Sequence, residues 1–253
     1  MKRNRVREKM HAGQATLGCF LGLGSPNVAE LLAHTGFDWL VIETEHNGLD
    51  SAEIEHMLMA ISSSEAIPLV RVPSSDPIFI QRALDMGALG IVVPMIRTAA
   101  EAEAVVRATR YPPHGSRSFG PLRASHYSLD NADYLRSAND NIIVVLILET
   151  KEAVNDLEAI CAVAGIDCIY LGPFDLCLSL GLDPLAKSHA EIDAIVEQML
   201  AITKRFGIAA GTGANMPDQL RACLKQGFTF IGYGPDYVML TQAALAGITA
   251  FRA

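Results

Sequence analysis

Several apolar segments of the sequence end abruptly in polar side chains that could do chemistry. The stretch FDWLVIETEH at 37–46 passes through four apolar residues, 39–42, and then brings Glu43, Glu45 and His46 together. An imidazole titrates near neutral pH and can move a proton, and carboxylates accept hydrogen bonds or bind cations. A strand must also end somewhere, so the same residues could mark an ordinary exit from the protein interior.

Arg71 lies inside the apolar segment PLVRVP, where an arginine needs an anionic partner because burying an unpaired charge is costly. The partner could be the carboxylate or enolate oxygen of a substrate. It could also be Glu45 or Glu149, in an ion pair that only stabilises the fold. His46 has the same two interpretations, as a proton-transferring group or as an ordinary hydrogen-bonding side chain.

Two further carboxylates follow apolar segments, Glu149 after IIVVLIL and Asp175 after a Gly-Pro turn. Side by side they would repel each other unless a cation or a shared proton relieved the repulsion. A divalent ion held by two protein oxygens keeps positions free for water and a bidentate ligand, as is common for Mg2+. The alternative is that each carboxylate caps the helix that follows it.

Short apolar segments alternate with longer segments of helical period along the whole chain, and these elements must position the polar residues. Several segments, such as 142–148, are apolar on consecutive residues, which is typical of parallel strands buried on both faces. Helical period is clearest at 52–65, 99–110 and 189–206. The eight predicted strands are 16–22, 37–43, 67–72, 89–95, 142–148, 167–172, 207–211 and 228–232.

A weak internal repeat predicts how the strands are connected. Gly36, Gly87, Gly165 and Gly227 each follow a helical segment and precede an apolar one, where glycine often ends a helix. A doubled βα unit repeated four times predicts a single-domain (β/α)8 TIM barrel over residues 1–253. A doubly wound open sheet is the alternative, but no G-x-G-x-x-G follows the first strand. In a barrel, the carboxyl ends of all strands face one mouth.

One long segment, 111–141, has little apolar periodicity and is rich in Pro, Gly, Ser, Asn and Asp. Loops of this length inside compact domains are uncommon and are often functional. We predict that it follows the fourth strand and hangs over the C-terminal mouth. An oligomer contact is the equally weighted alternative.

Composition excludes several classes of protein. A net charge of −8 argues against binding to nucleic acid or to an anionic membrane surface, and no segment reaches the ~18 apolar residues that span a bilayer. The cysteines are odd in number and form no C-x-x-C pair, which favours reduced thiols in the cytoplasm. No lysine lies in a predicted strand, so carbonyl chemistry here would use a metal rather than a Schiff base.

Five motifs in this order and spacing, FDWLVIETEH, PLVRVP, RATRYPPHGSRS, LILET and LGPFDL, closely resemble the HpcH/HpaI aldolase family. These are metal-dependent class II pyruvate aldolases of the phosphoenolpyruvate/pyruvate superfamily. The resemblance covers nearly the whole chain, from about Gly13 to the last predicted helix. It implies a modified (β/α)8 barrel, a homo-hexamer built as a trimer of dimers with sites near subunit contacts, and a 2-oxo acid and an aldehyde as small-molecule partners.

The resemblance also implies roles for single residues. Glu149 and Asp175 match the family's metal ligands, with Mg2+ or Mn2+ as the expected ion and Co2+ or Zn2+ as the alternatives. Arg71 matches the arginine that contacts the pyruvate carbonyl and its enolate. His46 matches the acid–base histidine, and Asp85 matches an aspartate that orients this histidine across an interface.

Further positions concern the substrate. The backbone of Gly172, Pro173 and Phe174 is expected to lie along the bound pyruvate, and Arg123 falls near an arginine that influences the aldehyde end. Phe174 stands where alanine is common, and Thr212 where an apolar side chain often helps to select the aldehyde. Glu43 and Ile147 also depart from the usual aspartate and glutamine.

We therefore expect a metal-dependent aldolase that cleaves 4-hydroxy-2-oxo acids to an aldehyde and pyruvate, or a related 2-oxo acid such as hydroxypyruvate. A second reading is another carbon–carbon lyase or condensing reaction of the superfamily, on a substrate with a phosphate or CoA handle. No Lys or Arg between Ile208 and Leu220 supports such a handle. A third reading is a non-catalytic barrel, because fold alone does not fix function.

Overall fold

The strands of the computed structural model, which describes residues 3–253, close into a parallel barrel in which each strand pairs with its neighbour in sequence. β1 also pairs with β8, so the barrel has no free edge. The strands are β1 (Thr16–Leu21), β2 (Trp39–Glu43), β3 (Ile67–Arg71), β4 (Gly90–Val93), β5 (Ile143–Leu148), β6 (Cys168–Leu171), β7 (Ala209–Ala214) and β8 (Phe230–Tyr233). The predicted fold and all eight predicted strands are confirmed, with limits that differ by a few residues.

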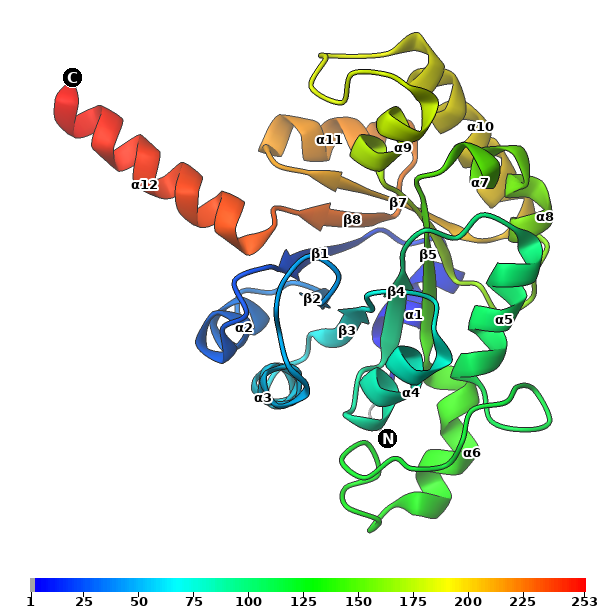
Figure 1. Ribbon diagram of the computed structural model, residues 1–253. Coiled ribbons are helices and arrows are strands. Elements are labelled where there is room, and N and C mark those ends of the chain that lie inside the picture. The colour runs from blue at the N-terminus through cyan, green and yellow to red at the C-terminus, as the bar shows by residue number, and fades with distance from the viewer. Residues whose placement is uncertain (1–2) are drawn as a thin grey trace.

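Helices surround the barrel (Figure 1). They are α1 (Arg5–His11), α2 (Pro26–Ala33), α3 (Ser51–Ser62), α4 (Pro77–Asp85), α5 (Ala99–Thr109), α6 (Asn131–Asn141), α7 (Lys151–Asn155), α8 (Leu157–Cys161), α9 (Pro173–Leu180), α10 (Ala190–Phe206), α11 (Pro217–Gln226) and α12 (Asp236–Arg252). Capping boxes begin α3, from Asp50, and α5, from Thr98. The four glycines of the sequence repeat have φ between +99° and +108°, as their place after helices predicts.

The interior of the barrel is a separate core from the layer between strands and helices. At its centre the rings of Trp39 and Phe230 stack face to face with centroids 4.0 Å apart. The indole Nε1 of Trp39 donates to Thr16 Oγ1 at 3.2 Å, which satisfies its only polar atom. Gly18 pairs with Trp39 in the register of β1 and β2, and its missing side chain makes room for the indole.

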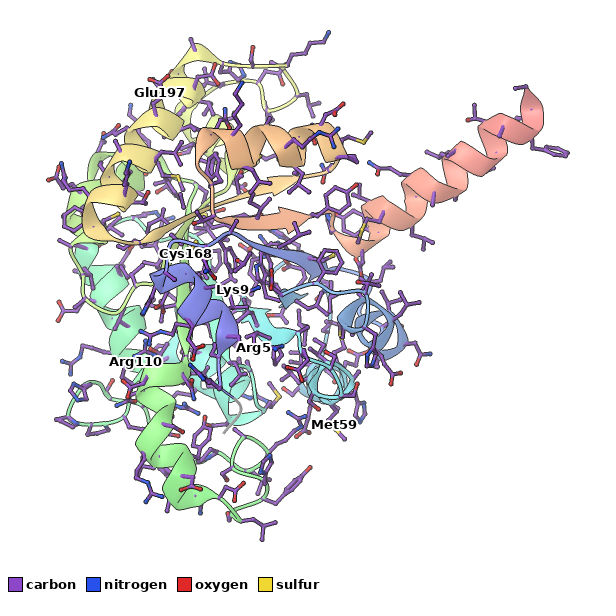
Figure 2. The ribbon with its side chains drawn as sticks, turned by 180° about the vertical axis from the view of Figure 1, so that it is seen from behind. Arg5, Lys9, Met59, Arg110, Cys168 and Glu197 are labelled. Carbon is purple, nitrogen blue, oxygen red and sulfur yellow. The ribbon has the colours of Figure 1, made fainter. Side chains whose placement is uncertain are left out.

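The amino-terminal end of the barrel is closed by α1, which the sequence did not predict. Figure 2 shows α1, with Arg5 and Lys9, lying across this end. Val6 and Met10 enter the interior core, and the buried Asn4 donates from Nδ2 to the carbonyl oxygens of Leu89 and Asn141. The interior of the barrel is therefore filled from this end by side chains of α1.

The prediction that 111–141 hangs over the C-terminal mouth is wrong. The segment follows α5, not β4 itself, and α5 runs back along the barrel to the amino-terminal end. There Arg117 forms an ion pair with Asp85, the last residue of α4, and Arg123 donates to the carbonyl oxygen of Met86. The final third of the segment is α6, whose end is held by Asn4.

The last helix, α12, leaves the barrel and extends away from it as an arm (Figure 1). Its start is fixed because the buried Asp236 accepts hydrogen bonds from the backbone N–H groups of Gly22, Leu23 and Tyr237. Asp236 is the only buried residue of this helix. Large apolar side chains along the arm are exposed, namely Leu240, Leu245, Ile248 and Phe251.

Replacing Gly18 by alanine tests the packing at the centre of the barrel. A Cβ at this position would lie 2.0 Å from Cδ2 of Trp39, so the indole or a strand must shift. We expect the free energy of unfolding to fall by about 1–3 kcal/mol, measured by denaturant titration. The control is Gly247→Ala in α12, where nothing lies within 4 Å and alanine favours the helix. Equal stability of the two variants would contradict the packing described here.

Candidate active site

A cavity of about 720 Å3 opens at the carboxyl ends of the strands. Its lining includes His46, Arg71 and Glu149, together with residues 172–175. The sequence-predicted residues at the ends of β2, β3, β5 and β6 are therefore brought to one mouth. This is the place where barrels of this class carry their chemistry.

Glu43 organises one side of this cavity. It is in register with Arg71 at the ends of the adjacent strands β2 and β3, and its Oε2 forms an ion pair with Arg71 Nη2 and accepts from Nε. Its Oε1 accepts the backbone N–H groups of Glu45 at 2.7 Å and of His46 at 3.1 Å. One buried carboxylate thus fixes both the guanidinium and the turn that carries the histidine.

The guanidinium of Arg71 lies between two carboxylates. Its Nη1 is 3.2 Å from Glu45 Oε2, and its Cζ lies 5.6 Å from the centroid of the Phe20 ring. Among the structural partners expected from the sequence, Glu45 is confirmed, and Glu43, which the sequence did not suggest as a partner, is closer. The guanidinium is held in place and still lines the cavity.

His46 is exposed at the mouth, with 64% of its side chain accessible, and its Nε2 lies 3.5 Å from Glu45 Oε2. Burial raises the pKa of Glu45 above its ordinary value, and Arg71 and His46 oppose this rise. The imidazole and this carboxylate form a pair that can hold or pass a proton at the edge of the cavity.

Glu149 is 3% exposed. Its Oε1 accepts the backbone N–H of Met95, a residue with a φ of +58°, at 2.6 Å. Burial raises the pKa of Glu149 to about 7, opposed by the Met95 N–H and reinforced by the charges of Glu45 and Asp175. A Cβ at Gly172 would lie 2.8 Å from Glu149 Oε2, so only glycine leaves this oxygen free.

These observations fit a divalent cation held by Glu149 and Asp175. Both carboxylates line the cavity, and the charge of Asp175 helps to raise the pKa of Glu149. Hard carboxylate oxygens are the ligands that Mg2+ and Mn2+ prefer. Within residues 3–253 no group of three or more His, Cys, Asp or Glu side chains is placed to hold a metal. A site of two protein ligands leaves the other positions to water and substrate.

Three predicted site residues do not reach the cavity of their own chain. Asp85 lies at the opposite end of the barrel, 2.6 Å from Arg117 Nη2, and burial raises its pKa. Arg123 is at the same end, where its Nη1 donates to Met86. Thr212 alternates with the inward-facing Gly213 on β7 and therefore points away from the barrel interior.

Of the three residues that form the floor of the cavity, only Ile147 was named from the sequence. Phe20, Ile147 and Tyr170 line it from β1, β5 and β6. Residues two apart on a strand point to the same side. Ile147 could have been predicted in this way from Glu149, and Tyr170 from Gly172. Asn47, Asn215 and Tyr237 also line the cavity.

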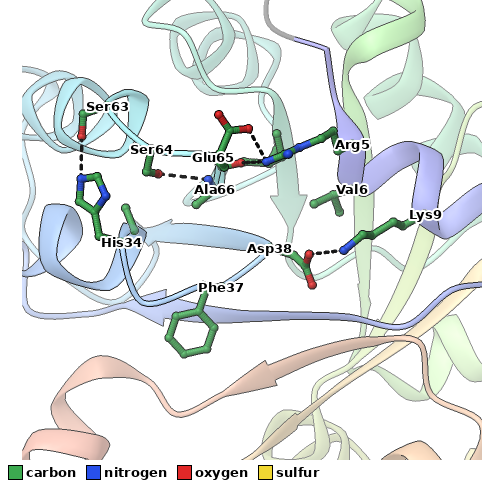
Figure 3. Close-up of a pocket in the computed structure, with 13 residues that line it drawn as sticks. Arg5, Val6, Lys9, His34, Phe37, Asp38, Ser63, Ser64, Glu65 and Ala66 are labelled. Atoms are coloured by element: carbon green, nitrogen blue, oxygen red, sulfur yellow. Dashed lines mark hydrogen bonds and ion pairs between the residues drawn. The ribbon is translucent and has the colours of Figure 1, made fainter.

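A second cavity, of about 460 Å3, lies beside α1 at the closed end (Figure 3). Its charged side chains are paired with one another: Arg5 with Glu65 at 2.5 Å, and Lys9 with Asp38 at 2.6 Å. Satisfied pairs leave little net field for a charged ligand. The candidate site is therefore the carboxyl-terminal cavity.

Comparison with known proteins gives the family. Residues 16–243 match the family described as HpcH/HpaI aldolase/citrate lyase. The chain therefore belongs to the HpcH/HpaI aldolase/citrate lyase family. This membership confirms the resemblance seen in the sequence, and it makes the protein a carbon–carbon lyase.

Relatives in this family match over nearly their whole length. A hydroxypyruvate/pyruvate aldolase of Roseovarius nubinhibens is 36% identical, over 98% of this chain and 97% of the relative. A protein of the same name from Cupriavidus necator is 38% identical, over 98% and 93%. The crystal structure of a family member from Burkholderia cenocepacia has a TM-score of 0.93 at 33% identity, covering 99% of this chain and all of that one.

The HpcH/HpaI member described here has no helix, among residues 3–253, long and apolar enough to cross a membrane.

Removing the Glu43 carboxylate should weaken the fold as well as the site. In Glu43→Ala, Arg71 loses its nearer partner and the N–H groups of Glu45 and His46 lose their acceptor. We expect a loss of about 3 kcal/mol in unfolding free energy, the lower end for a broken buried pair because Arg71 keeps Glu45. Denaturant titration measures it, with the exposed Glu103→Ala in α5 as the control. A Glu43→Ala variant as stable as this control would exclude the anchoring role.

Proposed function

We propose that the protein is a metal-dependent aldolase that cleaves 4-hydroxy-2-oxo acids to an aldehyde and pyruvate, or a related 2-oxo acid such as hydroxypyruvate. The observation that carries this proposal is the pair of carboxylates, Glu149 and Asp175, sharing one cavity with Arg71 and His46. Relatives with closely similar sequences bear the names hydroxypyruvate/pyruvate aldolase and 4-hydroxy-2-oxo-heptane-1,7-dioate aldolase. This supports the same class of substrate here.

Glu149 and Asp175 would hold the divalent ion, with Mg2+ or Mn2+ favoured by their oxygen ligands and Co2+ or Zn2+ as alternatives. When bound, the ion acts as a Lewis acid on the carbonyl of the 2-oxo acid. The backbone of Gly172, Pro173 and Phe174 turns into the start of α9 beside this pair. The free N–H groups of that first turn can receive the donor carboxylate.

The reaction follows from the placement of the remaining groups. In cleavage, the 4-hydroxyl loses its proton, the C3–C4 bond breaks, and its electrons pass to the 2-oxo group as an enolate. Arg71, held by Glu43, stabilises this developing negative charge without having to reorient. His46, paired with Glu45, moves protons to and from the reacting groups, and protonation at C3 completes the 2-oxo acid.

Another carbon–carbon lyase or condensing reaction is the second candidate. A phosphate or CoA handle needs cationic side chains, and the described lining of the cavity contains Arg71 and His46 but no lysine. Arg71 is already shared by two carboxylates. A non-catalytic barrel is the third candidate and would not require the carboxylate pair.

We further propose that the protein works as a homo-hexamer, a trimer of dimers, in the cytoplasm. The exposed apolar side chains of α12 favour cover by another copy. Asp85 and Arg123 lie at the end of the barrel away from the cavity, so only a neighbouring copy could bring them to His46 and to the aldehyde end. The loop before α6 would then be an oligomer contact. The cysteines within the described residues are unpaired, in keeping with a reducing compartment.

Pyruvate release from a panel of 4-hydroxy-2-oxo acids tests the proposed activity. We expect EDTA to abolish release, Mg2+ or Mn2+ to restore it, and Glu149→Gln to lose both release and Mn2+ binding measured by calorimetry. The matched control is Glu152→Gln, an exposed glutamate of α7 that should behave as wild type. Release that survives both EDTA and Glu149→Gln would exclude the metal assignment, and the absence of release from every substrate would exclude pyruvate cleavage.

Native mass spectrometry tests the assembly. We expect a six-chain mass for the wild type and smaller species for Leu240→Asp/Ile248→Asp, because charged groups oppose burial of the α12 arm. Activity should fall with the assembly if Asp85 and Arg123 act on a neighbouring copy. Leu185→Asp, also at an exposed leucine, is the control. A wild type that stays monomeric at micromolar concentration would contradict the proposal.

A further inference from the structure

Tyr170 presents an unusual polar group at the floor of the catalytic cavity. The side chain comes from the middle of β6 and lines the cavity, although the residue is only 9% exposed. Its hydroxyl forms no hydrogen bond with any residue in the described part of the chain. Burial raises the pKa of the phenol, so the hydroxyl keeps its proton at neutral pH and can donate.

Three glycines make the space in which this hydroxyl lies. A Cβ at Gly232 would be 3.0 Å from the Tyr170 hydroxyl oxygen, and a Cβ at Gly213 would be 3.3 Å from it. A Cβ at Gly211 would be 2.6 Å from Cδ2 of the ring. The backbone of β7 and β8 therefore accommodates the phenol without offering it a side-chain partner.

The rest of the floor is apolar. The Phe20 ring lies 5.6 Å from the Tyr170 ring, centroid to centroid, and Ile147 pairs with Tyr170 in the register of β5 and β6. On the same inward face, Glu149 and Gly172 are each two residues further toward the mouth. The Tyr170 backbone thus lies one layer of side chains below the proposed metal ligands, and its hydroxyl extends toward the mouth as far as Gly213 and Gly232.

Different groups of a small 2-oxo acid would contact different layers of the cavity. Its carboxylate and 2-oxo oxygen have partners in the upper layer, at the carboxylate pair, the 172–174 turn and Arg71. The aldehyde must approach C3 from the open mouth, because the floor closes the other side. C3 can carry a further substituent besides the new C3–C4 bond, and this substituent would face the floor.

Resting on the proposed function, we infer that Tyr170 determines donor specificity by hydrogen-bonding a 3-hydroxyl group, so that the enzyme favours 3-hydroxy-2-oxo acids such as hydroxypyruvate over pyruvate. The phenol donates to, or accepts from, the donor hydroxyl. The methyl group of pyruvate offers no such partner. The corresponding cleavage substrates are 3,4-dihydroxy-2-oxo acids.

Tyr170→Phe isolates this contact, because phenylalanine keeps the ring that packs over the three glycines. We expect kcat/KM for hydroxypyruvate, measured in condensation with one fixed aldehyde, to fall about tenfold, the usual effect of losing one hydrogen bond. The value for pyruvate should stay within about twofold. Tyr233→Phe is the matched control, since Tyr233 follows Gly232, which faces the Tyr170 and Phe20 rings inside the barrel, and therefore points out of the barrel.

The donor ratio separates the outcomes. Equal losses of kcat/KM for both donors would assign Tyr170 a structural role, and no loss for either donor would exclude contact with the 3-hydroxyl. Either result overturns the inference while leaving the aldolase assignment intact. If the wild type condenses neither donor, the proposed function fails. Calorimetric binding of hydroxypyruvate and pyruvate with Mn2+ then decides, and the inference requires that Tyr170→Phe weaken hydroxypyruvate alone.

Discussion

The carboxylate of Glu43 holds the guanidinium of Arg71 with one oxygen and the backbone of Glu45 and His46 with the other. This is possible because Glu43 and Arg71 are in register at the ends of adjacent parallel strands and both point into the barrel. A guanidinium fixed in this way offers its charge to a developing oxyanion without reorganisation, which is the main electrostatic advantage of a protein site over water. The turn proposed for acid–base chemistry and the arginine proposed for the oxyanion thus share one anchor.

The barrel around this anchor has a closed end and an open end. Stacked aromatic rings, Trp39 on Phe230, fill its centre, and α1 covers the amino-terminal end. Toward the mouth, glycines of β7 and β8 replace bulky inward side chains and leave room for the Tyr170 ring. The same strands therefore supply a packed core below and a cavity above, with the phenol at the boundary between them.

Carboxylates outnumber cationic side chains in this cavity. Burial raises the pKa of both Glu45 and Glu149, and the charge of Asp175 adds to the rise at each. Arg71 compensates chiefly the negative charges of Glu43 and Glu45, with which it forms ion pairs. The unbalanced charge near Glu149 supports the proposed divalent cation, because two crowded carboxylates are stable when a cation lies between them.

The sequence by itself determined the eight strands, the glycines that precede four of them and the polar residues at the mouth, because these depend on local periodicity and on conformations that glycine tolerates. Tertiary structure decided which groups meet. Strand register made Glu43 the main partner of Arg71, and alternation turned Thr212 away from the cavity. The long loop lies at the far end because α5 runs back along the barrel before the loop begins. Which atoms meet depends on register and chain direction, and neither is a local property of the sequence.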